Sequence, residues 1–167
     1  MGTTIVADRR GDVEDVFRAE YGRLVGLARL LVDDPGQAEE VVQDAFVALY
    51  RRWGVVEHPA RYLRTSVVNG ARGRLRQRAV ARRHLRVADP VRPGGPDEGA
   101  VLSEEHLAVA AALARLPDRQ RACIALRFYG DLSEAEIAAT LGISAGSVKT
   151  HVHRGMAALA TALEELR

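Results

Sequence analysis

The sequence has almost no cysteine and no long apolar run. Its 167 residues include a single cysteine, Cys123, so an internal disulfide framework is excluded. Cys123 lies in an apolar stretch with helical spacing, which indicates a core residue rather than a nucleophile. No stretch is apolar over the length of a membrane span, and the N-terminal residues lack the pattern of a secretion signal. We therefore expect a cytoplasmic protein without membrane insertion.

Strand patterns and catalytic motifs are also missing. No alternating run of β-branched residues is bounded by turns, so the chain is predicted to be all helical. It has no glycine-rich phosphate loop, no histidine pair at the spacing of one helical turn, and no serine or cysteine motif with a positioned base. His151 and His153 would point apart on a helix, so they are not expected to share a metal ion. We expect no catalysis and no cofactor.

Charge is distributed unevenly along the chain, although the net charge is only +2. Residues 58–88 contain nine arginines and no acidic residue, whereas residues 1–57 are net acidic. A charge run is usually a solvated face, but an acid-free arginine run inside a helical pattern favours a polyanionic partner.

The N-terminal part of the chain predicts three helices. Apolar residues from Val13 to Leu31 have helical spacing and mark a first helix that should end before Asp33. Asp34 and Pro35 predict the cap and the first turn of a second helix. Its expected core residues are Ala38, Val41, Val42, Ala45, Phe46, Leu49, Tyr50 and Trp53.

Pro59 predicts the start of a third helix, and short loops between the three helices indicate one small bundle. Arginines of this helix that need not face the core are Arg61, Arg64, Arg72, Arg74, Arg76 and Arg78. The segment Asp89–Gly99 then has three prolines and three glycines in eleven residues, which is typical of a flexible linker. Helical patterns resume at Ser103, break at Pro117 and continue into the C-terminal run.

Residues 132–159 predict two short helices joined by a turn. Ser133 and Glu136 form a capping box that starts the first helix. Gly142 supplies a left-handed residue that ends it, and Ser144 can cap the next helix. The second helix should bury one stripe, formed by Val148, Val152, Met156, Leu159, Leu163 and Leu166. This layout predicts a helix-turn-helix whose second helix enters a DNA major groove, with a plain helical hairpin as the alternative.

Together these motifs resemble the sigma-70 family of RNA polymerase sigma factors, in its extracytoplasmic-function (ECF) group. The segments DPGQAEEVVQDAFVALYRRW and HPARYLRTSVVNGARGRLRQR are similar to family region 2, and LPDRQRACIALRFYGDLSEAEIAATLGISAGSVKTHVHRGMAAL is similar to region 4. The resemblance implies two small helical domains, region 2 at 10–86 and region 4 at 103–167, joined by a flexible linker at 87–102. It also implies a bacterial sigma factor that directs promoter-specific transcription initiation as a non-catalytic subunit.

The resemblance further implies partners and site residues. Core RNA polymerase, promoter DNA and an anti-sigma factor are the expected partners. Binding of core polymerase is expected at Glu39, Glu40, Gln43 and Asp44 of the second helix. Opening and reading of the minus-10 element is expected at Arg61, Arg64, Asn69, Arg72 and Arg76 of the third helix. Reading of the minus-35 element is expected at Ser147, Lys149, Thr150, His151, His153 and Arg154 of the recognition helix.

The chain departs from the family pattern in places, and two other classes of protein remain as alternatives. Gly73 stands where many relatives carry an aspartate, and His151 and His153 replace positions that are often basic or aromatic, which bears on promoter preference. A free-standing dimeric helix-turn-helix regulator would bind duplex DNA without polymerase, but the arginine-rich and acidic helices argue against it. A helical adaptor would bind only protein, and the charge pattern argues against that class.

Overall fold

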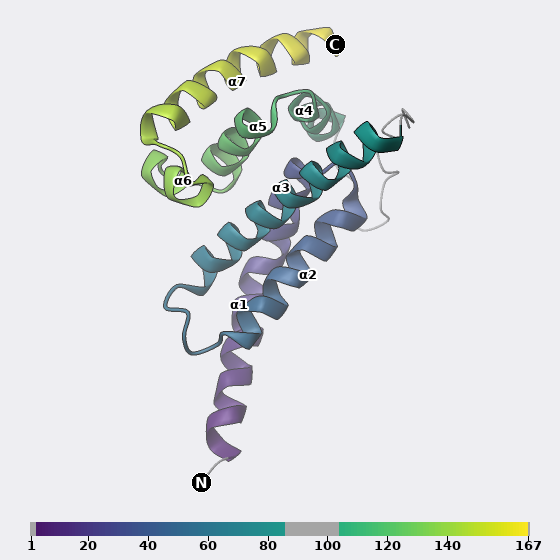
Figure 1. Ribbon diagram of the computed structural model, residues 1–167. Coiled ribbons are helices and arrows are strands. Elements are labelled where there is room, and N and C mark those ends of the chain that lie inside the picture. Colours follow the sequence, from purple (N-terminus) through teal and green to yellow (C-terminus); the bar gives the residue numbers. More distant parts are fainter. Residues whose placement is uncertain (1–2, 86–103, 167) are drawn as a thin grey trace.

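The computed structural model describes residues 3–85 and 104–166, and both ranges are almost entirely helical (Figure 1). The expected linker at 87–102 and its neighbour Ser103 lie outside the described residues. No strand occurs within the two described ranges, which confirms the prediction of an all-α fold. Among the helices of those ranges, none is both long and apolar enough to cross a membrane.

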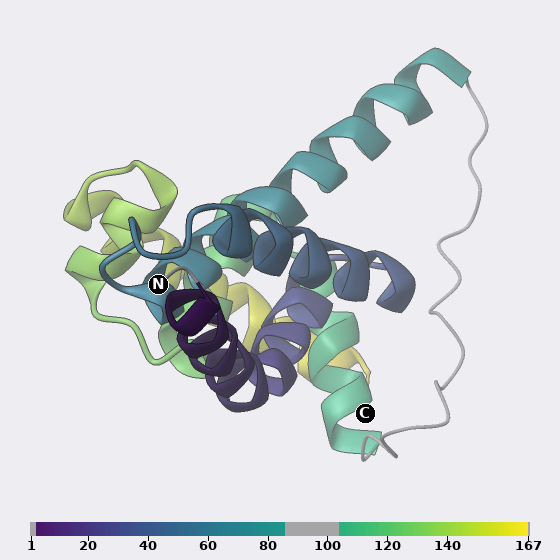
Figure 2. The same ribbon diagram turned by 90° about the horizontal axis from the view of Figure 1, so that it is seen from below.

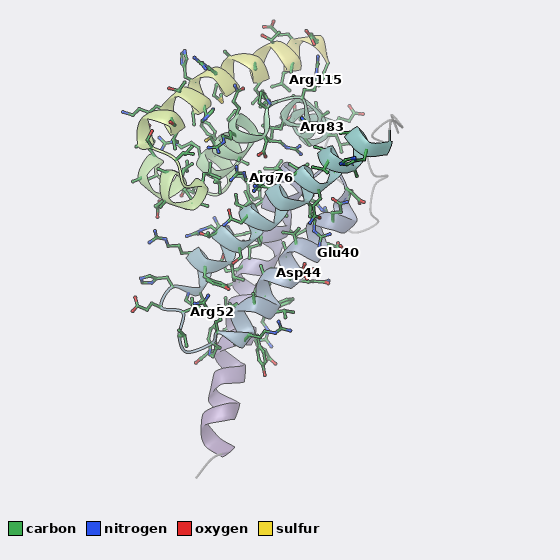
Figure 3. All side chains as sticks on the ribbon, viewed as in Figure 1. Glu40, Asp44, Arg52, Arg76, Arg83 and Arg115 are labelled. Atoms are coloured by element: carbon green, nitrogen blue, oxygen red, sulfur yellow. The ribbon has the colours of Figure 1, made fainter. Side chains whose placement is uncertain are left out.

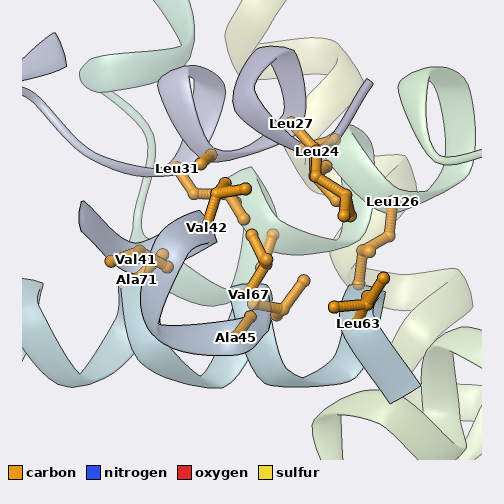
Figure 4. Packing of buried hydrophobic residues seen from close by; sticks show 14 of the residues in the cluster. Leu24, Leu27, Leu31, Val41, Val42, Ala45, Leu63, Val67, Ala71 and Leu126 are labelled. Carbon is orange, nitrogen blue, oxygen red and sulfur yellow. The ribbon is translucent and has the colours of Figure 1, made fainter. Parts of the chain in front are cut away.

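The N-terminal block is a bundle of α1 (Thr3–Leu31), α2 (Pro35–Arg51) and α3 (Pro59–Leu85), each packed on the other two. The Asp34 carboxylate caps α2 by accepting the Gly36 backbone N–H at 2.9 Å, as predicted. Pro35 follows at the first helical position, where its missing N–H costs no hydrogen bond. The apolar faces of the three helices meet in a core that includes Leu24, Leu27, Leu31, Val42, Ala45, Leu63 and Val67 (Figure 4).

The C-terminal block consists of α4 (Glu104–Ala114), α5 (Asp118–Ile124), the π-helical segment η1 (Ala125–Tyr129), α6 (Glu134–Leu141) and α7 (Ala145–Glu165). Helix α6 starts at the predicted capping box, in which the Ser133 N–H donates to Glu136 Oε2 at 2.8 Å and the Glu136 N–H donates to Ser133 Oγ at 3.2 Å. Gly142 ends α6 in a left-handed conformation with φ of 65°. Ser144 then caps α7 by accepting the Ser147 N–H. The predicted helix-turn-helix is therefore confirmed.

The line along which α7 packs differs from the predicted stripe. Met156 and Leu166 are 41% and 47% exposed, so the prediction that they are core residues was wrong. Gly155 and Ala162 are buried on α7 instead. A Cβ on Gly155 would lie 2.6 Å from Ile124 Cδ1, so its absence lets α5 approach closely. Spacing of large apolar residues alone does not reveal a contact line that is made by small residues.

The two blocks share one hydrophobic core. Leu126 of η1 is fully buried in the cluster that holds the core residues of α1, α2 and α3, and Figure 4 places it beside Leu63 and Leu24. Helix α1 contacts α4, α5 and η1, while α3 contacts α6. Seen from below, the C-terminal half of α3 extends past the rest of the bundle (Figure 2). The described blocks thus lie directly against each other.

Arg121 of α5 is the centre of this contact and is only 5% exposed. Its guanidinium donates to the backbone carbonyls of Leu30 and Val32 and pairs with Asp33 at 3.1 Å. The final carbonyls of a helix have no partner within that helix and need donors from outside. A side chain of the C-terminal block therefore caps the end of α1 in the N-terminal block.

The small residue at position 155 leads to a first prediction. Gly155→Leu should destabilise the protein by about 1 to 3 kcal/mol, because the new side chain overpacks the contact with Ile124. Chemical denaturation followed by circular dichroism measures the change. Gly73→Ala is the control: no atom lies within 4 Å of its added Cβ, so it should keep or raise stability by up to about 1 kcal/mol. Equal stability of Gly155→Leu and the parent would contradict the packing line described above.

Candidate nucleic-acid and polymerase interfaces

Four of the residues predicted to read the minus-35 element lie exposed on α7. Lys149, Thr150, His153 and Arg154 are exposed, and they follow the helix N-terminus on the side away from the buried Val148. The Lys149 ammonium lies 3.8 Å from the Glu134 carboxylate of α6, a loose exposed pair that costs little to break. The Thr150 hydroxyl donates to the Gly146 carbonyl at 3.1 Å. This face can present one or two cations and several hydrogen-bond donors to a DNA groove.

The other two predicted minus-35 residues are less open. The Ser147 hydroxyl accepts a hydrogen bond from the Ser144 hydroxyl at 2.9 Å, which ties it to the α7 cap. His151 is half-buried, and its Nδ1 atom is buried without a hydrogen-bond partner among the described residues. Ser147 and His151 are thus less exposed than the four residues above.

The residues predicted to bind the minus-10 element lie along α3, but in two environments. Arg61, Asn69 and Arg76 are exposed. Arg72 is 9% exposed and its Nε donates to the Asp118 carboxylate of α5 at 3.3 Å. Arg64 is half-buried, and its Nε has no hydrogen-bond partner among the described residues. The C-terminal block therefore covers part of the arginine-rich face.

Charges of the C-terminal block face these arginines. The pKa of Glu136 is held below its ordinary value, first by the hydrogen bonds from Ser133 and then by the nearby positive charges of Arg64 and Arg61. With Asp118 at Arg72, carboxylates of α5 and α6 thus lie along the α3 surface. In Figure 3 Arg76 lies on the side of α3 toward the C-terminal helices, whereas Glu40 and Asp44 lie on the opposite side.

The predicted polymerase-binding residues form one row on α2, and an arginine of α3 contacts two of them. Gln43, Glu40 and Asp44 are exposed, and Glu39 is half-buried. Arg74 Nη1 donates to Glu40 Oε2 at 2.6 Å, and Arg74 Nη2 donates to Asp44 Oδ2 at 3.3 Å. The Arg74 guanidinium thus partly neutralises the Glu40 and Asp44 carboxylates, and both carboxylates remain open to solvent. The sequence analysis expects Arg74 to lie outside the core, but its pairing with α2 could not be predicted, because pairing between helices depends on how they pack.

The structure also exposes apolar residues beside this row. Val47 and Tyr50 are 51% and 56% exposed on α2, so the prediction of Tyr50 as a core residue was wrong. Phe17 of α1 is 43% exposed and stacks on Tyr21 at a centroid distance of 4.6 Å. Phe46 tilts against Phe17 at 5.0 Å. Exposed apolar side chains are therefore found on α2, on the helix that carries the acidic row, and on the neighbouring α1.

Comparisons with known proteins show the family of the chain. The family model for sigma-70 region 2 matches residues 16–81, and the model for sigma-70 region 4 matches residues 106–159. The chain is 33% identical over 154 residues to an RNA polymerase sigma-E factor of Streptomyces coelicolor, which covers 89% of this chain and 84% of that protein. It is 32% identical over 141 residues to the ECF RNA polymerase sigma factor SigL of Mycobacterium tuberculosis, which covers 81% of this chain and 80% of SigL.

Two solved structures with the same fold are complexes of two proteins. The sigma factor RpoE of Bartonella quintana, solved with the anti-sigma factor NepR, aligns with a TM-score of 0.77 and 22% identity over 93% of this chain and 99% of that one. CnrH, solved with the cytosolic domain of CnrY, aligns with a TM-score of 0.67 and 24% identity over 93% of this chain and 90% of that one. Matches to both family regions, in order and over nearly the whole chain, show that this protein belongs to the sigma-70 family of RNA polymerase sigma factors, in its ECF group.

Proposed function

We propose that the chain binds core RNA polymerase through α2, reads the minus-35 element through α7 and holds the opened minus-10 element on α3. The observation that carries this assignment is the pair of surfaces in one chain: an exposed polar recognition helix and an arginine-rich helix, each in the matching family region. The functional domains are then region 2 at 10–86 and region 4 at 103–167. The protein acts in the cytoplasm, where core polymerase is found, and the polymerase performs the chemistry.

Such a subunit contributes binding energy for promoter DNA, because the polymerase performs the chemistry. On α7, each good base contact contributes about 1 to 3 kcal/mol of discrimination, and contacts to phosphate fix the position without reading sequence. On α3, unstacked bases can be held by edge hydrogen bonds from Asn69 and by the cations around it. Arginines contribute attraction that weakens as salt rises, because bound counterions are released from the nucleic acid.

An anti-sigma factor is the proposed inhibitory partner. RpoE and CnrH have this fold and were solved with NepR and with the cytosolic domain of CnrY. An inhibitor of this kind has two surfaces to compete for, the α2 row and the α7 face. Binding to either would block a contact that transcription needs.

Run-off transcription tests the proposed function. Core polymerase with this chain should yield discrete transcripts from selected promoter fragments, and core polymerase alone should not. Protection of the promoter DNA by this protein should require polymerase, and the protected region should lack twofold symmetry. A twofold-symmetric footprint made by the chain without polymerase would instead identify a dimeric regulator.

The α2 row generates a prediction for core binding. The double variant Glu40→Gln, Asp44→Asn should weaken the complex with core polymerase by about 2 to 5 kcal/mol, if both carboxylates become buried against cations. Arg74→Gln is the matched control, because it removes the internal partner of both carboxylates and leaves them free for polymerase. Fluorescence titration of core enzyme measures affinity. If both variants lose stability alike and neither loses affinity, the carboxylates serve only the contact with α3.

The α7 face generates a prediction for promoter binding. Arg154→Ala and Lys149→Ala should each weaken binding of the holoenzyme to a promoter duplex found in the run-off assay. If the side chain contacts a base, the binding free energy should weaken by about 1 to 3 kcal/mol and the preference for that base should relax. If it contacts a phosphate, binding should weaken equally for all promoter sequences. Arg115→Ala is the control, since Arg115 is paired with Glu165 at 2.6 Å and lies off the recognition face. Parent-like binding by both α7 variants would show that another face reads the DNA.

A further inference from the structure

The last turns of α3 bury no face of the helix. Between Gln77 and His84, every side chain that the structure describes is exposed except that of Arg78, which is half-buried. These positions point in all directions around the helix axis, because successive residues turn by about 100°. Figure 2 shows this end of α3 extending past the bundle. Packing therefore contributes little to this end, and folding alone does not explain its composition.

The charges on the end of α3 are all of one sign. Residues 76–86 contain five arginines, one histidine and no acidic residue. Arg78 has a carboxylate partner, because Asp33 lies 3.7 Å from its guanidinium. Arg76 and Arg83 are exposed, and no carboxylate among the described residues pairs with either of them. Two cations of this end are thus available to an anion from outside the chain.

Arg76 and Arg83 lie on the same side of α3. Seven residues of an α-helix make almost two whole turns and span about 10 Å. Figure 3 shows Arg83 beyond Arg76 along the helix. The phosphates of one DNA strand follow each other at about 3.4 Å along the duplex axis. The two guanidinium groups can therefore contact different phosphates of one duplex, and such contacts fix position without reading sequence.

We propose that the end of α3 binds the phosphate backbone of the promoter duplex between the minus-10 and minus-35 elements. The inference rests on the proposed function, in which α3 holds the opened minus-10 element and α7 reads the minus-35 element. Along the chain, this end follows the proposed minus-10 residues and precedes region 4. The DNA that it meets in a promoter complex is then the segment between the two elements. That segment stays double-stranded, because strand opening is confined to the minus-10 element.

A duplex fits this end of α3 better than a single strand or a protein. Proteins that bind single strands stack the bases on aromatic side chains, and residues 76–86 contain no phenylalanine, tyrosine or tryptophan. The core of a protein-binding patch is apolar and depleted of charge. Here Val80 is an exposed apolar side chain within a stretch of arginines. Repeated cations on an exposed helix are the pattern that neutralises phosphates.

The variant Arg83→Gln tests the contact through its dependence on salt. Glutamine is about as good a helix former as arginine, so circular dichroism should match the parent. Holoenzyme with the variant should bind a promoter fragment more weakly, and its affinity should fall less steeply as salt rises. One lost phosphate contact lowers the slope by about 0.9, so the advantage of the parent should shrink roughly 3.5-fold between about 50 and about 200 mM salt. Filter binding measures both affinities.

Arg115→Gln is the matched control for the lost charge. Arg115 is an exposed arginine that follows α4 and pairs with Glu165, so it lies outside the end of α3. Holoenzyme with this variant should keep the salt slope of the parent.

Promoter fragments with neutral methylphosphonate linkages locate the contact. Neutral linkages between the two elements should weaken binding of the parent holoenzyme. The Arg83→Gln holoenzyme should lose little further on this fragment, because it already lacks the contact. The same number of neutral linkages upstream of the minus-35 element is the control, and there the losses from the variant and from the DNA should add.

The outcomes separate this inference from the proposed function. A parent-like salt slope for Arg83→Gln, or additive losses with the neutral spacer, would overturn the duplex contact. Loss of affinity for core polymerase instead of DNA would also overturn it, because the end of α3 would then bind protein. Run-off transcription with the same holoenzymes is scored separately. Transcription by the parent together with parent-like DNA binding by Arg83→Gln would reject this inference alone.

A failure of the parent in run-off transcription would reject the proposed function. The free full-length chain then still tests the end of α3 on a duplex of about 20 base pairs without promoter elements, where Arg83→Gln should again lower the salt slope by about 0.9. An unchanged slope on that duplex would show that the end of α3 does not bind duplex DNA.

Discussion

The arrangement of the whole molecule depends on which groups donate hydrogen bonds to the carbonyls at the end of α1. An α-helix leaves its last carbonyls without donors, and burying them unpaired costs about 1 to 3 kcal/mol each. Arg121 of α5 supplies those donors, and Asp33 balances its charge. Because the donor comes from the other block, the carbonyls at the end of α1 are hydrogen-bonded by Arg121 only when the C-terminal block packs against the N-terminal bundle. The buried charge fixes one register for the contact, since a shifted register would leave the guanidinium unpaired.

Local signals predicted local structure well. Asp34 and Pro35, the Ser133 and Glu136 capping box, and the left-handed Gly142 each determine an element boundary through hydrogen bonds to residues within a few positions. Such bonds do not depend on tertiary context, so the sequence is enough. The family resemblance supplied what local signals could not, namely which surfaces should meet polymerase and DNA.

The sequence could not predict where helices touch one another. Arg72 and Arg121 carry charges that normally stay in solvent, yet packing buries both against carboxylates or carbonyls of the other block. Tyr50 and Met156 have the spacing of core residues but lie on outer faces. Arg74 bridges Glu40 and Asp44 across 30 or more positions in sequence. All these placements are set by relative helix orientation, which the spacing of apolar residues leaves open.

The π-helical segment Ala125–Tyr129 links the core of the C-terminal block to its surface. Its hydrogen bond runs from the Gly130 N–H to the Ala125 carbonyl at 2.9 Å, so the turn holds one residue more than an α turn and is wider. Successive side chains in a wider turn are separated by less than the roughly 100° of an α-helix. From this one turn Leu126 enters the shared core and the Tyr129 hydroxyl lies over Gly26 of α1. A regular α turn of the same residues would direct Tyr129 elsewhere, so the width of a single turn bears on how the two blocks meet.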